Sequence, residues 1–522
     1  MTVLSIHNLS YQFDDGVTLF SNINAALAHP FTGLIGDNGA GKSTLVSILR
    51  GDIATQTGSV DITSSAIFVD QHEAVIDTQQ SIAAFLGLDN VLDALASIRN
   101  GDCRPTLFDV VGEQWQLEEE LQSRLAELGL PQDFNLPLSV LSGGQRAKLR
   151  LYKAFNSEAE LLVLDEPSNH LDTSSKLWLL DLIRNYDGQL LLISHDRLLL
   201  NEANAIWSIE NKTLRVFGGN YDAFSLLHQQ EADALTRQIS NIEKQQNQLN
   251  KQHIQNQIKA QKRAQQGEKL RKSNSQPKCF LDAKKESAGQ SAANRAKHHD
   301  SRKIGLAAQH QTLKAKQTQG HSVKLYTAAA NDTKRTVFCV EAGELAYGPS
   351  SSLNMQVKAH EKVQLVGANG TGKSLLLKTL QGQIKPKSGV FRVNSQMFML
   401  DQYYSLLRSD LTVLQNLEYH CSHLHQSEAR TLLAGIGFKG VTVSRLARDL
   451  SGGERMKLAV TAVCHQQTQP FLLLDEPDNH LDINSKNALA AALFGYQGGF
   501  LLVSHDEDFV NSVGITRMLY LD

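Results

Sequence analysis

The stretch Gly36-Asp37-Asn38-Gly39-Ala40-Gly41-Lys42-Ser43 decides the fold of this chain. It matches the pattern Gly-x-x-x-x-Gly-Lys-Ser in full, a loop whose glycines let backbone N–H groups close on phosphates. The apolar residues 31–35 precede the loop and the apolar residues 45–49 follow it. This predicts a strand, then the loop, then a helix, which is the context that a phosphate-binding loop requires.

A second set of the same motifs follows in the same order. Its glycine loop runs from Gly367 to Ser374. Each loop is followed by Leu-Ser-Gly-Gly, at 141–144 and 450–453, and then by an apolar run ending in Asp-Glu-Pro. The aspartate-to-histidine offset is 195 − 165 = 30 in the first set and 505 − 475 = 30 in the second. A tandem repeat at matched spacing predicts two ATPase cassettes that can complete each other's active sites.

Short apolar runs such as 161–164 and 190–193 are typical of buried parallel strands. The predicted fold class is therefore α/β, with two P-loop nucleotide-binding domains of the cassette type and a long helical linker between them. We expect a first ATPase domain over 1–224, a linker over 225–325 and a second ATPase domain over 326–522.

The first cassette is longer than the second between the glycine loop and Leu-Ser-Gly-Gly. Gln71 to Leu141 spans 70 positions and Gln402 to Leu450 spans 48, so about 22 residues are extra, near 96–129. We expect a helix at Glu113–Leu121. The extra residues form either a small protruding arm or ordinary padding of the helical subdomain.

Composition bounds the class of protein. Apolar content of 41% and charged content of 20% fit a globular protein. The five cysteines form no Cys-x-x-Cys pair, which argues against a zinc module or a disulfide framework and favours a reducing compartment. We see no secretory signal and no apolar run of the roughly 20 residues that a membrane helix needs. The expected location is cytoplasmic, with no membrane domain.

The linker is strongly basic. Residues 229–324 contain 19 Lys plus Arg and 7 Asp plus Glu, an excess of +12, so the rest of the chain carries −3 − 12 = −15. Such asymmetry indicates a polyanionic partner for the linker. Apolar residues recur at helical intervals and predict two helices, about 225–272 and 283–318, broken at 273–277 where Pro277 stands. The pair would form a hairpin with its tip near 272–285. The alternative is a solvated, partly disordered linker.

Several residue types in the repeat suit ATP and Mg²⁺. Lys42 and Lys373 are placed to contact the β- and γ-phosphates. Oxygen ligands for Mg²⁺ come from Ser43 and Ser374, from the strand-ending Asp165 and Asp475, and, on weaker grounds, from Gln71 and Gln402. The remaining nucleotide-binding residues predicted around the two loops are Gly36, Asn38, Gly39, Gly41, Thr44, Gly367, Asn369, Gly370 and Gly372.

Other repeated residues suit catalysis and recognition. Glu166 and Glu476 directly follow the aspartates, where each can polarise the attacking water as a general base. His195 and His505 each follow an apolar strand and can contact the γ-phosphate or orient the base. Anion-binding helix N-termini are predicted at Ser142, Gly143 and Gly144 and at Ser451, Gly452 and Gly453, and adenine stacking is predicted for Tyr11 and Tyr347.

This motif set resembles the ATP-binding cassette (ABC) ATPases over both cassettes. Ser168-Asn169-His170-Leu171-Asp172 and Asp478-Asn479-His480-Leu481-Asp482 resemble the Asn-His-Leu-Asp of the ABC-F class, as does Phe217–Tyr221 leading into a charged helical linker. The resemblance implies two cassettes without membrane spans. It also implies binding at the ribosome's tRNA exit site, with linker helices directed towards the P-site tRNA. Some members are translation factors and others protect ribosomes from antibiotics.

The resemblance further implies head-to-tail closure of the cassettes over two ATP molecules. Site one would combine the first glycine loop, Gln71, Asp165, Glu166 and His195 with Ser451, Gly452 and Gly453. Site two would combine the second loop, Gln402, Asp475, Glu476 and His505 with Ser142, Gly143 and Gly144. We expect both sites to hydrolyse ATP, a monomer, and a ribosomal partner (rRNA and tRNA) bound through the basic linker. Leu375 stands where the first loop has Thr44, and little effect is expected since the metal-ligating serine is kept.

Three other functions compete with a translational ATPase. Antibiotic protection of the ribosome would depend on the linker tip. An ATPase subunit of a membrane importer can carry paired cassettes, but a long basic hairpin has no role there. A DNA-repair ATPase of the same superfamily is disfavoured by the missing Cys-x-x-Cys modules and C-terminal tail.

Overall fold

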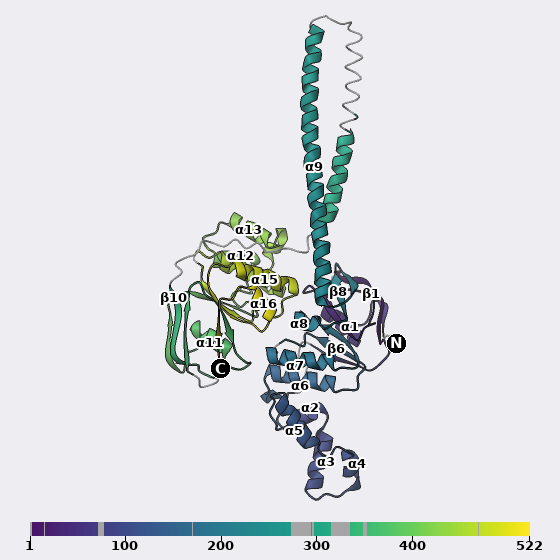
Figure 1. The fold of residues 1–522 in the computed structure, drawn as a ribbon, viewed down its shortest axis with the longest axis vertical. Helices are drawn as coiled ribbons and strands as arrows, with labels where there is room; N and C mark the ends of the chain where they lie inside the picture. The colour runs from purple at the N-terminus through teal and green to yellow at the C-terminus, as the bar shows by residue number, and fades with distance from the viewer. Residues whose placement is uncertain are drawn as a thin grey trace. The chain divides into compact units, whose positions relative to one another are not determined.

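The computed structural model describes residues 3–14, 16–70, 78–169, 171–272, 294, 297–314, 335–347, 352–467 and 469–521. The chain divides into two compact units (Figure 1). The cassette unit consists of Met1–Tyr221 with Ser322–Asp522, and the helical unit consists of Asp222–His321. Both cassettes therefore belong to one compact unit.

The first cassette is built on a six-stranded sheet of order β5-β6-β7-β3-β8-β9. All neighbouring pairs are parallel except β8 and β9. Every residue of β6 is buried, as expected for a strand covered on both faces. The predicted parallel core sheet is confirmed. Its strands are β3 (Phe31–Gly36), β5 (Ala66–Val69), β6 (Leu161–Asp165), β7 (Gln189–Ile193), β8 (Ala205–Glu210) and β9 (Thr213–Gly218).

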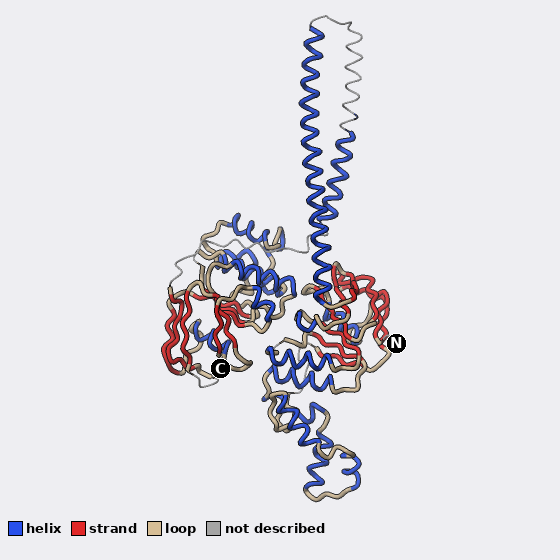
Figure 2. The backbone as a smooth tube through the Cα atoms, viewed as in Figure 1, coloured by secondary structure: helices blue, strands red, loops and turns tan. Residues whose placement is uncertain are grey.

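A separate antiparallel sheet of order β2-β1-β4 stands beside this core (Figure 2). Its strands are β1 (Leu4–Gln12), β2 (Thr18–Ala26) and β4 (Thr57–Ile62). The register of β1 shifts against both neighbours, which marks β-bulges. Gly58 has a φ of +86°, and a Cβ there would lie 2.4 Å from the carbonyl oxygen of His7. Only glycine fits this close approach of two backbones.

Helix α1 begins at Lys42, directly after the left-handed Gly41, so the predicted strand, loop and helix order is confirmed. The extra residues of the first cassette form part of a helical subdomain. The predicted helix over Glu113–Leu121 is wrong in its first half, because α4 ends at Val111, Gly112 has a φ of +52° and α5 begins at Leu117. The helices are α1 (Lys42–Arg50), α2 (Ile82–Leu86), α3 (Asp89–Arg99), α4 (Pro105–Val111), α5 (Leu117–Glu127), α6 (Gly143–Phe155), α7 (Thr173–Arg184) and α8 (Arg197–Leu200).

The second cassette repeats this plan with a five-stranded parallel sheet of order β14-β15-β16-β12-β17 and an antiparallel sheet of order β11-β10-β13. Its strands are β10 (Thr336–Glu344), β11 (Leu353–Lys358), β12 (Lys362–Val366), β13 (Ser388–Val393), β14 (Met397–Asp401), β15 (Phe471–Asp475), β16 (Phe500–Val503) and β17 (Arg517–Tyr520). Its helices are α11 (Lys373–Leu380), α12 (Val413–His420), α13 (Gln426–Gly435), α14 (Gly452–Cys464), α15 (Ile483–Gly495) and α16 (Glu507–Ser512).

The helical unit is dominated by α9 (Tyr221–Lys272), a single helix of 52 residues. Residues 297–314 are also helical and pair with α9. Gln246 Nε2 donates to the Leu306 carbonyl at 3.2 Å, and the rings of His253 and His299 stack 4.1 Å apart. The residue number increases along α9 from Gln246 to His253 while it decreases on the partner helix from Leu306 to His299. The two helices are therefore antiparallel. The predicted first helix is confirmed, and so is the predicted second helix over 297–314. The predicted tip near 272–285 lies outside the described residues except for Lys272, as do residues 283–293, 295, 296 and 315–318 of the predicted second helix.

Candidate functional site

The two glycine loops have the same backbone shape. Gly39 and Gly41 have φ values of +82° and +98°, and Gly370 and Gly372 have +86° and +94°. These left-handed conformations turn successive N–H groups to one side of the loop, which suits an anion. The Lys42 ammonium donates to the Gly36 carbonyl at 2.7 Å. Lys373 donates to the Gly367 and Ala368 carbonyls at 2.7 and 2.9 Å, so each ammonium lies across its loop.

The predicted metal ligands lie where parallel strands end. Asp165 ends β6 and Asp475 ends β15. In the second cassette, the Ser374 hydroxyl donates to Asp475 Oδ1 at 3.0 Å, so these two oxygen ligands stand together. Gln402 follows β14 and lies within hydrogen-bonding distance of the His480 imidazole. Gln71 lies outside the described residues.

The two glutamates predicted as general bases have an unusual backbone. Glu166 has a φ of +50° and Glu476 a φ of +48°, in the left-handed region that non-glycine residues seldom adopt. A hydrogen bond from each backbone N–H to the end of the adjacent strand holds this conformation, at Ile193 O (2.8 Å) and Val503 O (2.9 Å) respectively. The shape recurs in both cassettes, and such outliers concentrate at functional sites.

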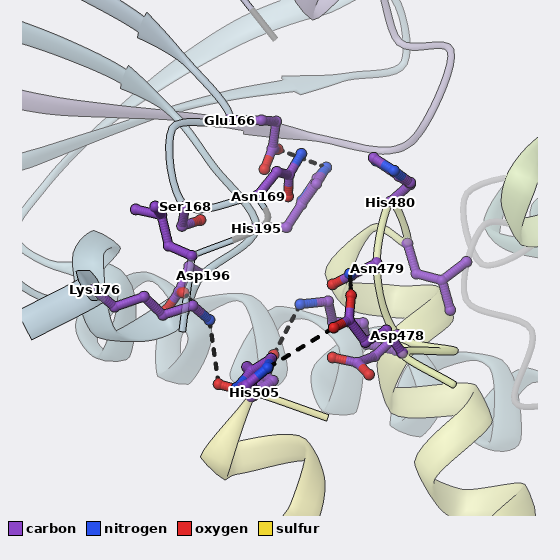
Figure 3. A pocket seen from close by; sticks show the side chains of 15 residues that line it. Glu166, Ser168, Asn169, Lys176, His195, Asp196, Asp478, Asn479, His480 and His505 are labelled. Atoms are coloured by element: carbon purple, nitrogen blue, oxygen red, sulfur yellow. Dashed lines mark hydrogen bonds and ion pairs between the residues drawn. The ribbon is translucent and has the colours of Figure 1, made fainter. Parts of the chain in front are cut away.

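Each glutamate lies close to the histidine predicted to work with it, and Figure 3 shows Glu166 beside His195. His195 Nε2 lies 3.6 Å from Glu166 Oε1, and His505 Nε2 lies 3.8 Å from Glu476 Oε1. Burial raises the pKa of Glu166 to about 7 and lowers the pKa of His195 well below its ordinary value. Burial, with Lys373 and Lys176 nearby, lowers the pKa of His505 to about 4. The imidazoles are therefore neutral at pH 7, as required of a group that accepts or passes on a hydrogen bond.

Some polar atoms of this site are buried without a partner. Among the described residues, Glu166 Oε1, His195 Nδ1 and His505 Nε2 have no hydrogen bond. Because buried polar atoms are nearly always satisfied, orphaned atoms call for an explanation. A water and a phosphate oxygen would supply the donors and acceptors that these atoms lack. The residues present therefore fit ATP and its attacking water.

The Ser-Gly-Gly motifs open helices in both cassettes. Ser142 caps α6 and Ser451 caps α14, each with a complete capping box to Gln145 or Glu454. The free N–H groups and the dipole at these ends favour an anion. The predicted adenine-stacking residues differ: Tyr11 packs edge-on against Phe13 with ring centroids 5.5 Å apart, whereas Tyr347 is 78% exposed.

The first glycine loop is held by the second cassette. The Asn38 amide N–H donates to Asp482 Oδ2 at 2.9 Å, and Asn38 Nδ2 donates to the His480 carbonyl at 2.8 Å. Asn484 Nδ2 also donates to Asp37 Oδ1 at 2.9 Å. Within the described residues, no hydrogen bond links this loop to Ser451, Gly452 or Gly453, so the composite sites remain a prediction.

A polar pocket brings the predicted catalytic residues of both cassettes together (Figure 3). It is lined by Glu166 and His195 from the first cassette and by Glu476 and His505 from the second. A family model described as ABC transporter matches residues 23–169 and 350–479. These are 147 + 130 = 277 of the 522 residues, which is more than half of the chain. The chain belongs to the ABC transporter family. Its tandem cassettes, together with its named relatives, place it in the ABC-F class of ATP-binding proteins.

Two curated relatives align with nearly the whole chain. The ABC transporter ATP-binding protein YfmM of Bacillus subtilis is 30% identical over 98% of this chain and 96% of its own length. The ribosome protection protein VmlR of the same organism is 27% identical over 99% of this chain and 86% of its own. A crystal structure of an archaeal ribosome recycling factor, in complex with a ribosomal stalk protein, matches 98% of this chain and 87% of its own. Its TM-score is 0.53 at 18% identity, so this likeness concerns the fold alone.

Among the helices of the described ranges, none has the length and hydropathy that crossing a membrane requires.

The family match and the named relatives confirm the ABC-F assignment that was made from the repeated motifs.

Sequence reasoning missed charged residues that line the same pocket. Lys176 and Lys486 each follow the strand-ending aspartate of their cassette by 11 positions (176 − 165 and 486 − 475). Asp196 and Asp506 directly follow the two histidines. The matched offset that drew attention to the histidines was equally present for the lysines and would have identified them.

Proposed function

We propose that this ABC-F protein is an ATPase that binds the ribosome in its ATP-bound state, modulates translation and is released by ATP hydrolysis at two composite sites. The observation that carries the proposal is the helical unit inserted between two complete cassettes. An importer subunit has no use for a long basic helix pair, whereas a protein that probes RNA does.

The basic side chains of α9 are available to such a partner. Lys251, Lys259 and Lys262 are exposed, as are Arg302 and Lys303 on the paired helix. With an excess of +12 over 229–324, the linker suits the phosphate backbone of rRNA or tRNA. Binding through such contacts releases counterions, so affinity should fall steeply as salt rises. VmlR, whose name describes ribosome protection, supports the same class of partner.

The chemistry follows from the placement of the catalytic residues. Lys42 and Lys373 would hold the phosphates, while Ser43 with Asp165 and Ser374 with Asp475 would hold Mg²⁺. Bound ATP and Mg²⁺ supply the scissile phosphoanhydride and the charge neutralisation that its cleavage needs. Glu166 and Glu476 would accept a proton from water, and the neutral His195 and His505 would orient it. If ATP stabilises the closed state and hydrolysis opens it, the rate of hydrolysis sets the residence time of the protein on its partner.

The test uses Glu166→Gln with Glu476→Gln, which removes both bases and leaves the residues placed to bind ATP. The variant in lysate is run on a sucrose gradient with ATP, without ATP, and with ATP at high salt. Co-sedimentation with ribosomes only with ATP at low salt is the expected result. A matched variant adds Lys251→Gln, Lys259→Gln and Lys262→Gln and should lose most of the ribosome peak. If the double variant stays at the top of the gradient under every condition, the proposed function is wrong.

Protection of the ribosome from an antibiotic is the second candidate, and the match to VmlR favours it. It predicts that deleting the gene lowers the inhibitory concentration of a ribosome-targeting drug, and that the wild-type gene, but not the double glutamine variant, restores it. Unchanged drug sensitivity across a panel of such drugs would leave translation control as the function.

A further inference from the structure

We propose that Lys176 and Lys486 are positioning residues that act across the cassette boundary. Each lies on the helix after one Asn-His-Leu-Asp turn. That helix contacts the histidine loop of the opposite cassette, defined as residues 194–197 or 504–507. Through these contacts, a movement at one ATP site changes the position of the histidine at the other, so the two sites are coupled. This inference rests on the proposed function, in that ATP is hydrolysed at both sites.

Lys176 holds both histidine loops at once. It lies in the first turn of α7, and its ammonium lies 2.8 Å from Asp196 Oδ2 in its own cassette. The same ammonium donates to the carbonyl oxygen of His505 in the second cassette at 3.3 Å (Figure 3). The Lys176 side chain is only 15% exposed, so these partners replace water around the charge. One side chain therefore joins α7 to the loops that carry His195 and His505.

Lys486 occupies the matching place on α15. Its ammonium lies 2.8 Å from Asp506 Oδ2 and its side chain is 17% exposed. The next residue, Asn487, accepts a hydrogen bond at 2.7 Å from Arg197, which follows His195 by two positions. The positive charge of Lys486 also helps to lower the pKa of His195. The helix after each turn thus contacts the opposite histidine loop, in both directions.

The aspartates transmit this contact to the backbone of the loops. Asp196 caps α8 by accepting from the Leu198 N–H at 3.1 Å, and Asp506 caps α16 by accepting from the Phe509 N–H at 3.0 Å. A movement of α7 or α15 would therefore pull on a fixed loop rather than on a free side chain. That loop carries the histidine placed against the catalytic glutamate.

The two directions are not equivalent. The second turn starts with Asp478, which is 2% exposed, where the first turn has Ser168. Lys486 therefore lies near two carboxylates of its own cassette, Asp506 and Asp478, and near Asp196 of the first cassette, and these raise its pKa despite burial. Lys176 pairs with Asp196 and donates to the opposite loop directly. We expect the coupling from the first cassette to site two to be the stronger one.

The test makes each site measurable alone. Glu166→Gln leaves only site two with its base, and Glu476→Gln leaves only site one. Lys176→Met is placed in both backgrounds, and kcat and KM for ATP are measured. The expected result is a loss of about tenfold in kcat at site two with KM little changed, and a smaller loss at site one. Lys176→Arg should restore most of the site-two rate.

A second readout needs no nucleotide. Hydrogen exchange of the amides of residues 504–509 should speed up in Lys176→Met, although the substitution lies in the other cassette. Lys212→Met, at an exposed lysine of the first cassette, is the matched control and should change neither rate nor exchange. Because Lys176→Met removes the ion-pair partner of Asp196, the double variant with Asp196→Asn repeats both measurements without that buried charge.

A larger loss at site one than at site two, with exchange at 504–509 unchanged, would show that Lys176 serves only its own cassette and would overturn the inference. If the wild-type protein hydrolyses no ATP, the proposed function fails, while the exchange measurement still decides whether the lysine holds the opposite loop.

Discussion

The two carboxylate oxygens of Asp482 bind different cassettes. Oδ1 accepts from the Ser485 N–H at 2.7 Å and caps α15, while Oδ2 accepts from the Asn38 N–H of the first glycine loop at 2.9 Å. A single side chain, 7% exposed, therefore fixes a helix start in one cassette and a phosphate-binding loop in the other.

Substitutions at Asp482 should separate these two roles. Asp482→Ser keeps a capping oxygen, whereas Asp482→Ala does not, so alanine should lower the free energy of unfolding by about 1 kcal/mol more than serine. Both changes remove the bond to Asn38, so hydrogen exchange at the Asn38 amide should rise equally in both. Urea unfolding and exchange mass spectrometry measure the two effects. Equal stability of the two variants would contradict the capping role, and unchanged Asn38 exchange would contradict the contact between cassettes.

The buried carboxyl of Glu166 should make stability depend on pH. Its pKa is raised from the model-peptide value of 4.5 to about 7, chiefly by burial. A raised pKa means that stability is fully present below 4.5 and is lost as pH rises through about 7, since the folded state then carries a buried charge.

Glu166→Gln removes this titration. It should match the wild type at pH 4.5 and exceed it at pH 8 by roughly 3 kcal/mol as an upper value. Denaturant unfolding at the two pH values measures the difference. A gap that stays constant between pH 4.5 and pH 8 would show that Glu166 is ionised throughout.

The sequence predicted what a local pattern determines. The glycine loop needs a strand before it and a helix after it, so α1 and α11 could be placed from Lys42 and Lys373 alone. Asp165 and Asp475 could be placed at strand ends because their apolar runs are continuous. The helix starts at the two Ser-Gly-Gly motifs could also be placed from the sequence, because serine is a common helix N-cap.

The rest depends on partners far away in the chain. The link between Asn38 and Asp482 spans 444 positions, and nothing near either residue signals it. The antiparallel sheets escaped prediction because bulges interrupt the alternation of β1. The predicted helix over Glu113–Leu121 is wrong before Leu117 because Gly112, with a φ of +52°, follows the end of α4 and α5 begins only at Leu117. Local periodicity cannot distinguish these cases.

Gly58 should be intolerant of a side chain. An added Cβ would meet backbone atoms of β1 at 2.4–2.6 Å, and its φ is +86°. Gly51 has a φ of +90° but open space around the same position, so it isolates the cost of the backbone conformation. Gly51→Ala should cost about 1 kcal/mol and Gly58→Ala clearly more, because backbone must shift as well. Thermal or denaturant unfolding compares the two. Equal costs would mean that β4 can move away from β1 without penalty.

The two tyrosines predicted to stack on adenine should respond differently to truncation. Tyr11 packs against Phe13 and Phe20, with ring centroids 5.5 and 6.2 Å away, so Tyr11→Ala should lower stability as well as nucleotide affinity. Tyr347 is 78% exposed, so Tyr347→Ala should leave the unfolding midpoint unchanged. It should still weaken ATP binding at the second loop by a few-fold, since a stacked aromatic pair contributes about 0.5–1.5 kcal/mol. Titration of a fluorescent ATP analogue into the Glu166→Gln, Glu476→Gln protein measures affinity without turnover. Tyr347→Phe is the control, since it keeps the ring, and an affinity that is the same for alanine and phenylalanine would exclude stacking at this position.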